Sequence, residues 1–303
     1  MCETDSYDLN ALKHWDFTGT ALAVVGHPIE HSISPHMHNA ALRQLGDEHS
    51  KFQTWRYFKF DIKTPELKEA LRLFHAKGFL GLNLTVPHKV TAVPLVKTTT
   101  AEAHRIGAVN TLLRQEDGYI GYNSDGYGLE RALDKEFDVT LRTATIILLG
   151  AGGAARAAAV QCLQAGCRNL WIGNRSTERL KTLLHALKGL APLRCIRPFP
   201  LTHLPTELPR TGIVINATSL GLRPNDPAPI DLKAFEPSLK VYDMIYKPAQ
   251  TALLRAARRR GMSSANGLSM LVHQGARALS IWTQTKAPID VMHRAALSSR
   301  ATN

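Results

Sequence analysis

The stretch TATIILLGAGGAARAAAVQCLQAG, residues 143–166, decides the fold of this chain. In it an apolar run is followed at once by a glycine-rich turn and then by an alanine-rich segment that ends at Gly166. This order predicts a buried strand, a tight turn and a helix. The turn, GAGGAARA at 150–157, fits the pattern G-x-G-x-x-A, in which backbone N–H groups at a helix N-terminus receive a pyrophosphate. We therefore expect this segment to bind a dinucleotide.

The segments after this turn continue to alternate between strand and helix patterns. We expect strands at 169–175, 212–218 and 239–246 and a helix over 176–188. Buried strands that alternate with helices are typical of a doubly wound α/β fold with a parallel sheet. We assign residues 127–267 to such a Rossmann-type domain.

The first 126 residues predict a second α/β domain. Its expected strands are 21–26, 55–61 and 79–85, followed by a β-hairpin over 109–125. Serine and threonine before proline predict two helix starts, with Ser34 as the N-cap of one helix and Thr64 opening the other. No element is predicted for residues 1–20. Two helical patterns, 269–282 and 288–297, are expected to return to this domain, which then comprises residues 1–126 plus 268–303.

Composition excludes several classes of protein. Hydrophobic residues make up 44% of the chain and charged residues 20%, as in ordinary globular proteins. The longest mostly apolar stretch, 144–155, is interrupted by glycines and is shorter than the roughly 18 residues of a membrane span. The start MCETDSYD is acidic where a secretory signal would be basic, and the four cysteines form no CxxC pair. We expect a cytoplasmic protein without a membrane partner.

The net charge of +12 is distributed unevenly along the chain. Residues 1–150 carry 16 basic and 18 acidic side chains, and residues 151–303 carry 21 and 7. This asymmetry fits an anionic partner of the second half, either nucleic acid or a phosphorylated cofactor, and it fits a solvated basic surface equally well. The most basic run, RAARRRG at 255–261, contains no aromatic residue that could stack on a base. We therefore expect no nucleic-acid partner.

The residues at the end of the expected strand 169–175 indicate which dinucleotide is bound. NAD-binding proteins usually carry an acidic residue here, which holds the ribose 2′-hydroxyl. This chain instead has Asn174-Arg175-Ser176, with Arg179 one turn further on. An arginine at this place pairs with a 2′-phosphate, so the sequence favours NADP over NAD. The alternative is an ordinary surface arginine at the start of a helix.

Polar side chains lie at the expected strand ends and helix starts of the first domain. Ser32 and Ser34 stand at a helix N-terminus, which suits a substrate carboxylate, although Ser34 could simply cap its helix. A lysine next to a carboxylate can exchange a proton with a substrate hydroxyl, and it can equally form a surface salt bridge. The candidates at the strand ends are Asn83, Thr85, Lys89 and Asp125.

A metal site is the competing interpretation of the histidines in this region. The candidates are His27, His31, His36 and His38. Pro28 and Pro35 interrupt any helical spacing between them, and the chain has no HExxH motif and no cysteine pair. We therefore expect no metal.

Taken together, the motifs resemble the shikimate dehydrogenase family from about residue 22 to residue 297. The matching segments occur in the family's order and are VVGHPIEHSISPHMHN, GLNLTVPHK, IGAVNTL, GYNSDGYG, GAGGAARA, NRS, INATSLGL, VYDMIY and NGLSMLVHQGA. The resemblance implies an oxidoreductase that reversibly reduces 3-dehydroshikimate to shikimate with NADPH, on the route to chorismate and the aromatic amino acids. A quinate/shikimate dehydrogenase of broader specificity, or a non-catalytic NADP- or RNA-binding relative, remains open, as does the choice between monomer and homodimer.

The resemblance also implies roles for individual residues. Lys89 and Asp125 would form the catalytic pair. The substrate would be held by Ser32, Ser34, Asn83, Thr85, Lys89, Asn110, Asp125, Tyr246 and Gln274. The cofactor NADP would be held by Gly150, Ala151, Gly152, Gly153, Ala154, Asn174, Arg175, Ser176, Arg179, Thr218, Met244 and Gly267.

Two positions depart from the family's pattern. Ser124 stands where threonine is usual, which keeps the hydroxyl and removes a methyl group, and Leu84 stands where valine is usual. Both changes concern packing more than chemistry.

Overall fold

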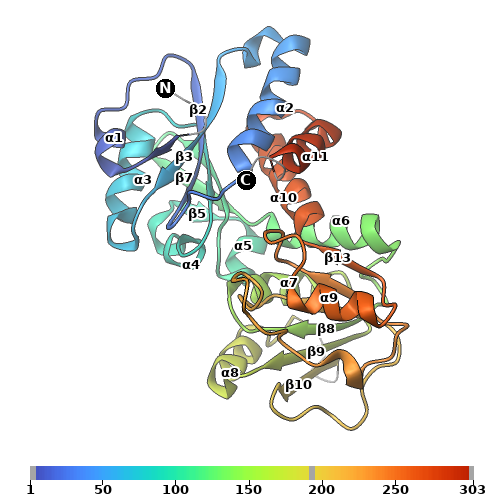
Figure 1. The fold of residues 1–303 in the computed structure, drawn as a ribbon. Helices are drawn as coiled ribbons and strands as arrows, with labels where there is room; N and C mark the ends of the chain where they lie inside the picture. The colour runs from blue at the N-terminus through green and yellow to red at the C-terminus, as the bar shows by residue number, and fades with distance from the viewer. Residues whose placement is uncertain (1–4, 191–194, 300–303) are drawn as a thin grey trace. The chain divides into compact units, whose positions relative to one another are not determined.

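The structure is a computed structural model that describes residues 5–190 and 195–299. The chain forms two compact units, shown in Figure 1. Unit 1 contains the residues up to Ser124 together with those from Gln274 onward, and unit 2 contains Asp125–His273. The second boundary falls inside the continuous helix α10 (Leu268–Thr283), where no break in the sequence pattern marks the crossing.

Unit 1 is built on a seven-stranded sheet with the order β1-β3-β2-β4-β6-β7-β5. The pairs β1/β3, β3/β2, β2/β4 and β5/β7 are parallel, whereas β4/β6 and β6/β7 are antiparallel. The three strands and the hairpin predicted for this region are confirmed. The strands are β1 (Ser6–Tyr7), β2 (Thr20–Gly26), β3 (Trp55–Asp61), β4 (Gly81–Leu84), β5 (Thr98–Thr99), β6 (Thr111–Gln115) and β7 (Gly118–Tyr122).

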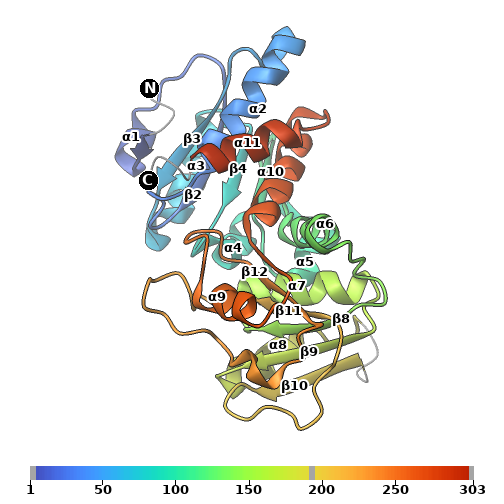
Figure 2. The same cartoon turned by 45° about the vertical axis from the view of Figure 1, so that its right-hand side comes forward.

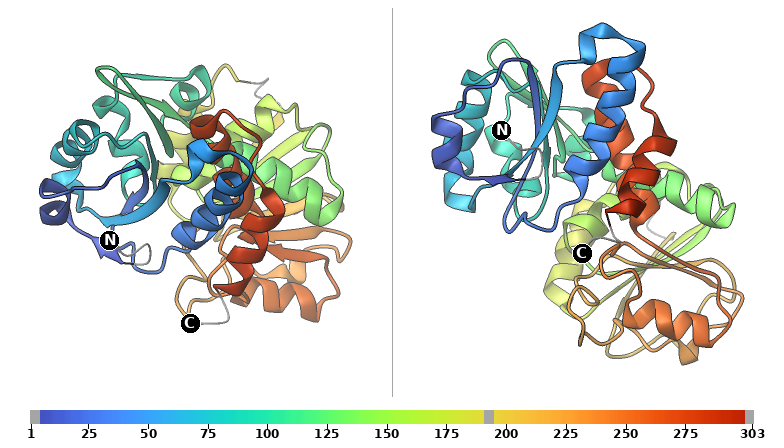
Figure 3. Two further views of the ribbon diagram at one scale, coloured as in Figure 1. Left: turned by 90° about the horizontal axis from the view of Figure 1, so that it is seen from above. Right: turned by 45° about the horizontal axis from the view of Figure 1, so that its top comes forward.

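The two C-terminal helices return to unit 1, as predicted, with α10 belonging to it from Gln274 onward. Helix α11 packs against α2, and Figures 2 and 3 show α2, α10 and α11 side by side. Trp282 of α10 donates its Nε1–H to the carbonyl of Leu112 in β6, at 2.9 Å. Besides α10, the helices of this unit are α1 (Leu9–Lys13), α2 (Ser34–Glu48), α3 (Leu67–Ala76), α4 (His88–Thr91), α5 (Ala101–Ile106) and α11 (Ile289–Ser298).

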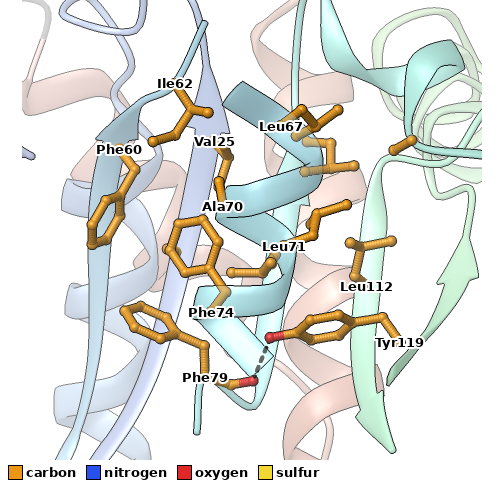
Figure 4. Close-up of a cluster of buried hydrophobic side chains, with 14 of the residues drawn as sticks. Val25, Phe60, Ile62, Leu67, Ala70, Leu71, Phe74, Phe79, Leu112 and Tyr119 are labelled. Carbon is orange, nitrogen blue, oxygen red and sulfur yellow. Dashed lines mark hydrogen bonds between the residues drawn. The ribbon is translucent and has the colours of Figure 1, made fainter. Parts of the chain in front are cut away.

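The core of unit 1 is rich in aromatic rings (Figure 4). Phe60, Phe74 and Phe79 are buried and meet edge to face, with ring centroids 4.8 to 5.6 Å apart. This is the arrangement that aromatic quadrupoles favour. The hydroxyl of Tyr119, also buried, donates to the carbonyl of Phe79 at 3.0 Å.

The start of α2 corrects one prediction. Ile33, not Ser34, occupies the N-cap, and Ser34 is already in the first helical turn with Pro35. The reason is that the preceding turn, closed by a bond from Ser32 N to Ile29 O, runs directly into the helix with Ile33 in a helical conformation. The backbone N–H of Ser34 donates to Oγ of Ser32 at 3.4 Å. Capping is therefore not the role of the Ser34 side chain.

The segment 1–20, for which no element was predicted, contributes to unit 1. Strand β1 pairs in parallel with β3, and Leu12 and Trp15 are buried. A two-residue strand and a five-residue helix are too short for periodicity to detect. Residues 1–4, which include Cys2, lie outside the described residues.

Unit 2 has a six-stranded sheet in which every pair is parallel, with the order β10-β9-β8-β11-β12-β13. The predicted Rossmann-type, doubly wound architecture is confirmed. The strands are β8 (Thr145–Leu149), β9 (Asn169–Asn174), β10 (Ile196–Pro200), β11 (Ile213–Asn216), β12 (Lys240–Asp243) and β13 (Ser264–Asn266). The helices are α6 (Asp125–Phe137), α7 (Gly153–Gln164), α8 (Thr177–Ala186) and α9 (Ala252–Arg259).

Strands β10 and β13 were not predicted. They are the two edge strands, and β10 contains two prolines while β13 has only three residues. Proline removes a backbone donor and is tolerated at a sheet edge, so its presence lowers any strand signal. No helix in the described part of the chain is long and apolar enough to cross a membrane.

Candidate active site

The glycine-rich turn of unit 2 follows the carboxyl end of β8. Strand β8 has β9 on one side and β11 on the other, so the direction in which the strands are added to the sheet reverses here. Gly150 has φ +120°, and a Cβ there would lie 3.0 Å from the carbonyl oxygen of Ala217. Only glycine adopts this turn without strain. Gly152 is the N-cap of α7, and a Cβ there would meet nothing within 4 Å. Gly152 and Gly153 are exposed at the start of α7, where a helix N-terminus can bind a pyrophosphate.

The loop after β9 lies beside this turn. Gly150 N donates to the carbonyl of Gly173 at 2.8 Å, and Arg175 follows two residues later. Asn174 Nδ2 donates to the carbonyl of Ser176 at 2.8 Å, and Ser176 caps α8 by accepting from Arg179 N. The side chains of Arg175 and Arg179 are exposed at the start of α8. The loop and the first turn of α8 thus each carry an exposed cation.

Three further predicted cofactor residues follow β11, β12 and β13. Both the backbone N–H and the hydroxyl of Thr218 donate to Oδ1 of Asn216, at 3.0 and 2.7 Å. Met244 N donates to the carbonyl of Asn216 at 3.0 Å. A Cβ on Gly267 would lie 2.0 Å from the carbonyl oxygen of Met244, so this close approach of two backbone segments requires glycine. The structure brings Thr218, Met244 and Gly267 to the same edge of the sheet as the glycine turn.

A buried carboxylate that was not among the predicted site residues also lies at this edge of the sheet. Asp243 ends β12, is fully buried, and accepts hydrogen bonds from Asn216 Nδ2 at 3.0 Å and Thr251 Oγ1 at 2.6 Å. Burial raises the pKa of the Asp243 carboxyl. The pair Asn216–Asp243 links the ends of two neighbouring strands. A polar residue at the end of an apolar strand, as in IVIN and KVYD, was the available signal.

In unit 1 the sheet itself brings the predicted polar residues together. The carboxyl ends of β4 and β7 lie on either side of the amino end of β6, because both strands run antiparallel to β6. In this register Asn83 pairs with Thr111, and Thr111 pairs with Tyr122. Residues far apart in sequence thus meet at a single edge of the sheet.

The side chains at this edge form a buried network. Asn83 Nδ2 donates to the Asn110 carbonyl at 3.0 Å and to Thr111 Oγ1 at 3.1 Å. Asn110 Nδ2 donates to Ser124 Oγ at 3.0 Å and to Gln274 Oε1 at 3.3 Å, and Ser124 N donates to Asn110 Oδ1 at 2.8 Å. The structure therefore places Asn83, Asn110 and Gln274 in one network.

Three members of this network, Tyr57, Thr111 and Ser124, were not among the predicted site residues. Tyr57, from β3, donates its hydroxyl to Asn83 Oδ1 at 2.8 Å. Thr111 accepts from Asn83 and donates to Asn110 Oδ1 at 3.1 Å. Tyr57 lies 26 residues from Asn83 in sequence, and no local pattern marks that contact.

Other predicted residues lie at the ends of β2 and β4. A Cβ on Gly26, at the end of β2, would lie 2.4 Å from Cγ2 of Thr85, so the two strand ends are in close contact. Ser32 is half-buried and Ser34 is buried at the start of α2, which follows β2. These hydroxyls lie at the positive end of the helix dipole of α2.

Lys89 lies in the short helix α4, directly after the cis bond Val86–Pro87. Its carbonyl accepts from Val109 N at 2.8 Å, which ties the α4 backbone to the residue before Asn110. Asp125 opens α6, immediately after Ser124, and is buried. Tyr246, the remaining predicted substrate residue, follows β12 in unit 2.

Two of the four candidate histidines, His27 and His38, contact other protein side chains. His27 Nδ1 lies 2.5 Å from Asp61 Oδ1. His38 is fully buried and stacks on Tyr57 with a centroid distance of 4.2 Å, and burial lowers its pKa to about 3. Over residues 5–190 and 195–299, no three His, Cys, Asp or Glu side chains gather in a group that could hold a metal ion.

Comparison with known proteins assigns the chain to a family. Three family models match: shikimate dehydrogenase substrate binding domain over residues 24–112, shikimate / quinate 5-dehydrogenase over 131–222, and shikimate 5′-dehydrogenase C-terminal domain over 267–297. The NADP(+) shikimate dehydrogenase of Moorella thermoacetica is 41% identical over 276 residues, which cover 90% of this chain and 91% of the relative. The chain belongs to the shikimate dehydrogenase family.

Solved structures of shikimate dehydrogenases share the fold. One, in complex with NADP+, has a TM-score of 0.84 and 33% identity, and the match covers 94% of this chain and 97% of that one. The enzyme of Thermus thermophilus, in complex with NADP(H) and shikimate, has a TM-score of 0.79 and 34% identity, with 92% and 99% covered. The similarity to shikimate dehydrogenases therefore extends over both units.

Proposed function

We propose that this protein catalyses the reversible NADPH-dependent reduction of 3-dehydroshikimate to shikimate, a step towards chorismate and the aromatic amino acids. The observation that carries the proposal is the buried amide and hydroxyl network of unit 1, formed by Asn83, Asn110, Ser124 and Gln274. Amide groups at the edge of a sheet are suited to a small ligand with several hydroxyls. Unit 2 supplies a glycine turn and two exposed arginines in the same chain.

NADP fits the residues that unit 2 presents. The glycine turn would hold the diphosphate through Gly150, Ala151, Gly152, Gly153 and Ala154, and the loop after β9 would hold the 2′-phosphate through Asn174, Arg175, Ser176 and Arg179. Thr218, Met244 and Gly267 would meet the nicotinamide half. The open space at Gly152 supports this fit, because a Cβ there meets no protein atom within 4 Å. When bound, NADPH supplies the hydride that reduces the ketone.

The residues predicted to bind the substrate would orient it. Ser32 and Ser34 would bind its carboxylate at the start of α2, with help from Tyr246. Asn83, Thr85, Asn110 and Gln274 would bind ring hydroxyls. Lys89 would give a proton to the oxygen that becomes the hydroxyl group, and in the reverse direction it would accept that proton. Asp125 would hold the same hydroxyl and orient the lysine.

The assay of four combinations tests this proposal. The purified protein is mixed with shikimate or quinate and with NADP+ or NAD+, and the change in the nicotinamide absorbance is followed. Shikimate with NADP+ should give the highest kcat/KM. A broader quinate/shikimate specificity is the second candidate, because one matching family model is described as shikimate / quinate 5-dehydrogenase. Absence of turnover in all four mixtures would mean a non-catalytic relative.

Replacement of Lys89 tests the catalytic assignment. General acid–base catalysis contributes about 10²- to 10⁴-fold, so Lys89→Ala should lower kcat at least a hundredfold while KM for shikimate changes less than tenfold. Asp125→Asn should also lower kcat, because the amide keeps the shape and loses the charge. Since the two residues act as a unit, the double variant should be far less impaired than the product of the single losses. Lys97→Ala, at an exposed lysine paired with Asp117, is the matched control and should leave kcat unchanged.

We further propose a cytoplasmic enzyme, monomeric or homodimeric, that works without nucleic acid. The described cysteines, Cys162, Cys167 and Cys195, are free thiols, as is usual in a reducing compartment. Burial raises the pKa of Cys162 and raises that of Cys167 to about 11, which keeps both protonated. Gel filtration of the purified protein measures the oligomeric state.

A further inference from the structure

Tyr57 is a buried residue whose hydroxyl meets the substrate network from the side of β3. Its side chain is fully buried, and its hydroxyl donates to Asn83 Oδ1 at 2.8 Å. Burial raises the pKa of Tyr57 well above its usual value, so the group remains a donor throughout the physiological range.

Asn83 has little hydrogen-bonding capacity left for a ligand. A side-chain amide offers two donor hydrogens and two acceptor positions. Among the described residues, the Asn110 carbonyl and Thr111 Oγ1 take both donor hydrogens, and Tyr57 takes one acceptor position. One acceptor position on Oδ1 is left. Toward a ligand, Asn83 therefore acts as an acceptor from a hydroxyl and not as a donor.

The position of the Tyr57 hydroxyl is itself well determined. Asn39 of α2 bonds the Tyr57 backbone on both sides, donating to its carbonyl and accepting from its N–H, each at 2.8 Å. His38 stacks on the ring with an interplanar angle of 2°. The helix that begins at Ser34 thus also holds Tyr57. These contacts restrict the movement of the Tyr57 backbone and ring, and with them the hydroxyl.

We propose that Tyr57 is a positioning residue for substrate binding, because its hydroxyl anchors the Oδ1 end of Asn83 so that the one remaining acceptor position points at a ring hydroxyl. This inference rests on the proposed function, which makes Asn83 a substrate ligand. No covalent step is involved. Tyr57 acts only through Asn83.

The test is the variant Tyr57→Phe, which keeps the ring stacked on His38 and removes only the hydroxyl. Loss of one neutral hydrogen bond should raise KM for shikimate about three- to tenfold, with kcat and KM for NADP+ changed less than twofold. Tyr119→Phe is the matched control, because Tyr119 is also buried in unit 1 and its hydroxyl donates to the Phe79 carbonyl (Figure 4). It should lower the thermal stability to a similar degree and leave KM for shikimate unchanged.

A double-mutant cycle shows whether Tyr57 acts through Asn83. In an Asn83→Ala background, Tyr57→Phe should change KM for shikimate less than twofold. An equal effect of Tyr57→Phe in both backgrounds, an unchanged or lowered KM in the single variant, or an equal rise with Tyr119→Phe would overturn the inference. If the wild type failed to oxidise shikimate, the proposed function would fall and this inference with it. If the wild type oxidises shikimate and Tyr57→Phe leaves KM for shikimate unchanged, the inference about Tyr57 is rejected and the proposed function stands.

Discussion

We propose that the choice of cofactor depends on Arg175. It is exposed in the loop that follows β9, next to the capped start of α8, and no acidic residue stands between Gly173 and Ser176. A guanidinium pairs with a phosphate through two parallel hydrogen bonds, whereas the ribose 2′-hydroxyl of NAD offers no charge. The Arg175 side chain should therefore contribute strongly to the binding of NADP+ and very little to the binding of NAD+.

Arg175→Ala should raise KM for NADP+ about ten- to a hundredfold, the value of a charge-assisted hydrogen bond to phosphate, and should change KM for NAD+ less than twofold. Arg258→Ala, at an exposed arginine on α9, is the control and should alter neither. Steady-state kinetics with both cofactors measure the effect. An equal rise in KM for NADP+ and for NAD+ would contradict binding of the 2′-phosphate by Arg175.

At the scale of elements, two glycines in the turn between β8 and α7 differ in what their positions require. Gly150 is required by the backbone, since its φ is +120° and the Ala217 carbonyl is close. Gly152 has φ −86°, which any residue adopts, and its Cβ position faces open space. The fold therefore does not require glycine at 152, and we propose that the bound cofactor does.

The variants Gly150→Ala and Gly152→Ala should separate these tasks. Gly150→Ala should destabilise the fold by about 1 to 3 kcal/mol through backbone strain, which lowers the Tm by roughly 2 to 4 °C per kcal/mol. Gly152→Ala should change the Tm by less than about 2 °C and raise KM for NADP+ at least tenfold, because the methyl group stands where the pyrophosphate approaches. Thermal melting and kinetics of both variants check this. A stable Gly152→Ala enzyme with normal KM would place the pyrophosphate elsewhere.

At the scale of the whole molecule, buried histidine makes stability depend on pH. His38 is fully buried, and burial lowers its pKa from 6.5 to about 3. The folded state then binds fewer protons than the unfolded state between these values. The contribution of buried, neutral His38 to the free energy of unfolding is fully present above pH 6.5 and is lost as the pH falls toward 3.

When the pH falls from 7.5 to 5, His38 should lower the free energy of unfolding by about 2 kcal/mol. The loss is about 1.36 kcal/mol for each pH unit below the pKa of the unfolded state. His38→Gln should remove this part of the pH dependence, whereas His203→Gln, at an exposed histidine, should not. Urea titrations at both pH values, followed by tryptophan fluorescence, measure the difference. Trp282, whose ring centroid is 5.7 Å from that of His38, reports on the site. An identical pH dependence in wild type and His38→Gln would show that folding does not lower the pKa of His38.

Much of the architecture could be predicted because it is encoded locally. The apolar run before Gly150 and the alternation of strands and helices specify a parallel α/β domain, since side-chain periodicity within an element depends only on neighbours in sequence. The ordered motifs indicated the family in the same way. Elements failed to be predicted where they are short or at an edge, as with β1, β10 and β13.

The contacts among site residues, in contrast, depend on the folded arrangement. From the amino-acid order one could derive the two α/β units, the glycine turn and the candidate residues at strand ends. That order could not show that Tyr57 donates to Asn83, or that Asp243 joins Asn216, because these pairs are 26 and 27 residues apart. Strand order and register place them side by side, and both follow from packing of the whole sheet against its helices. Hydrogen bonds across strands therefore leave no periodic trace along the chain.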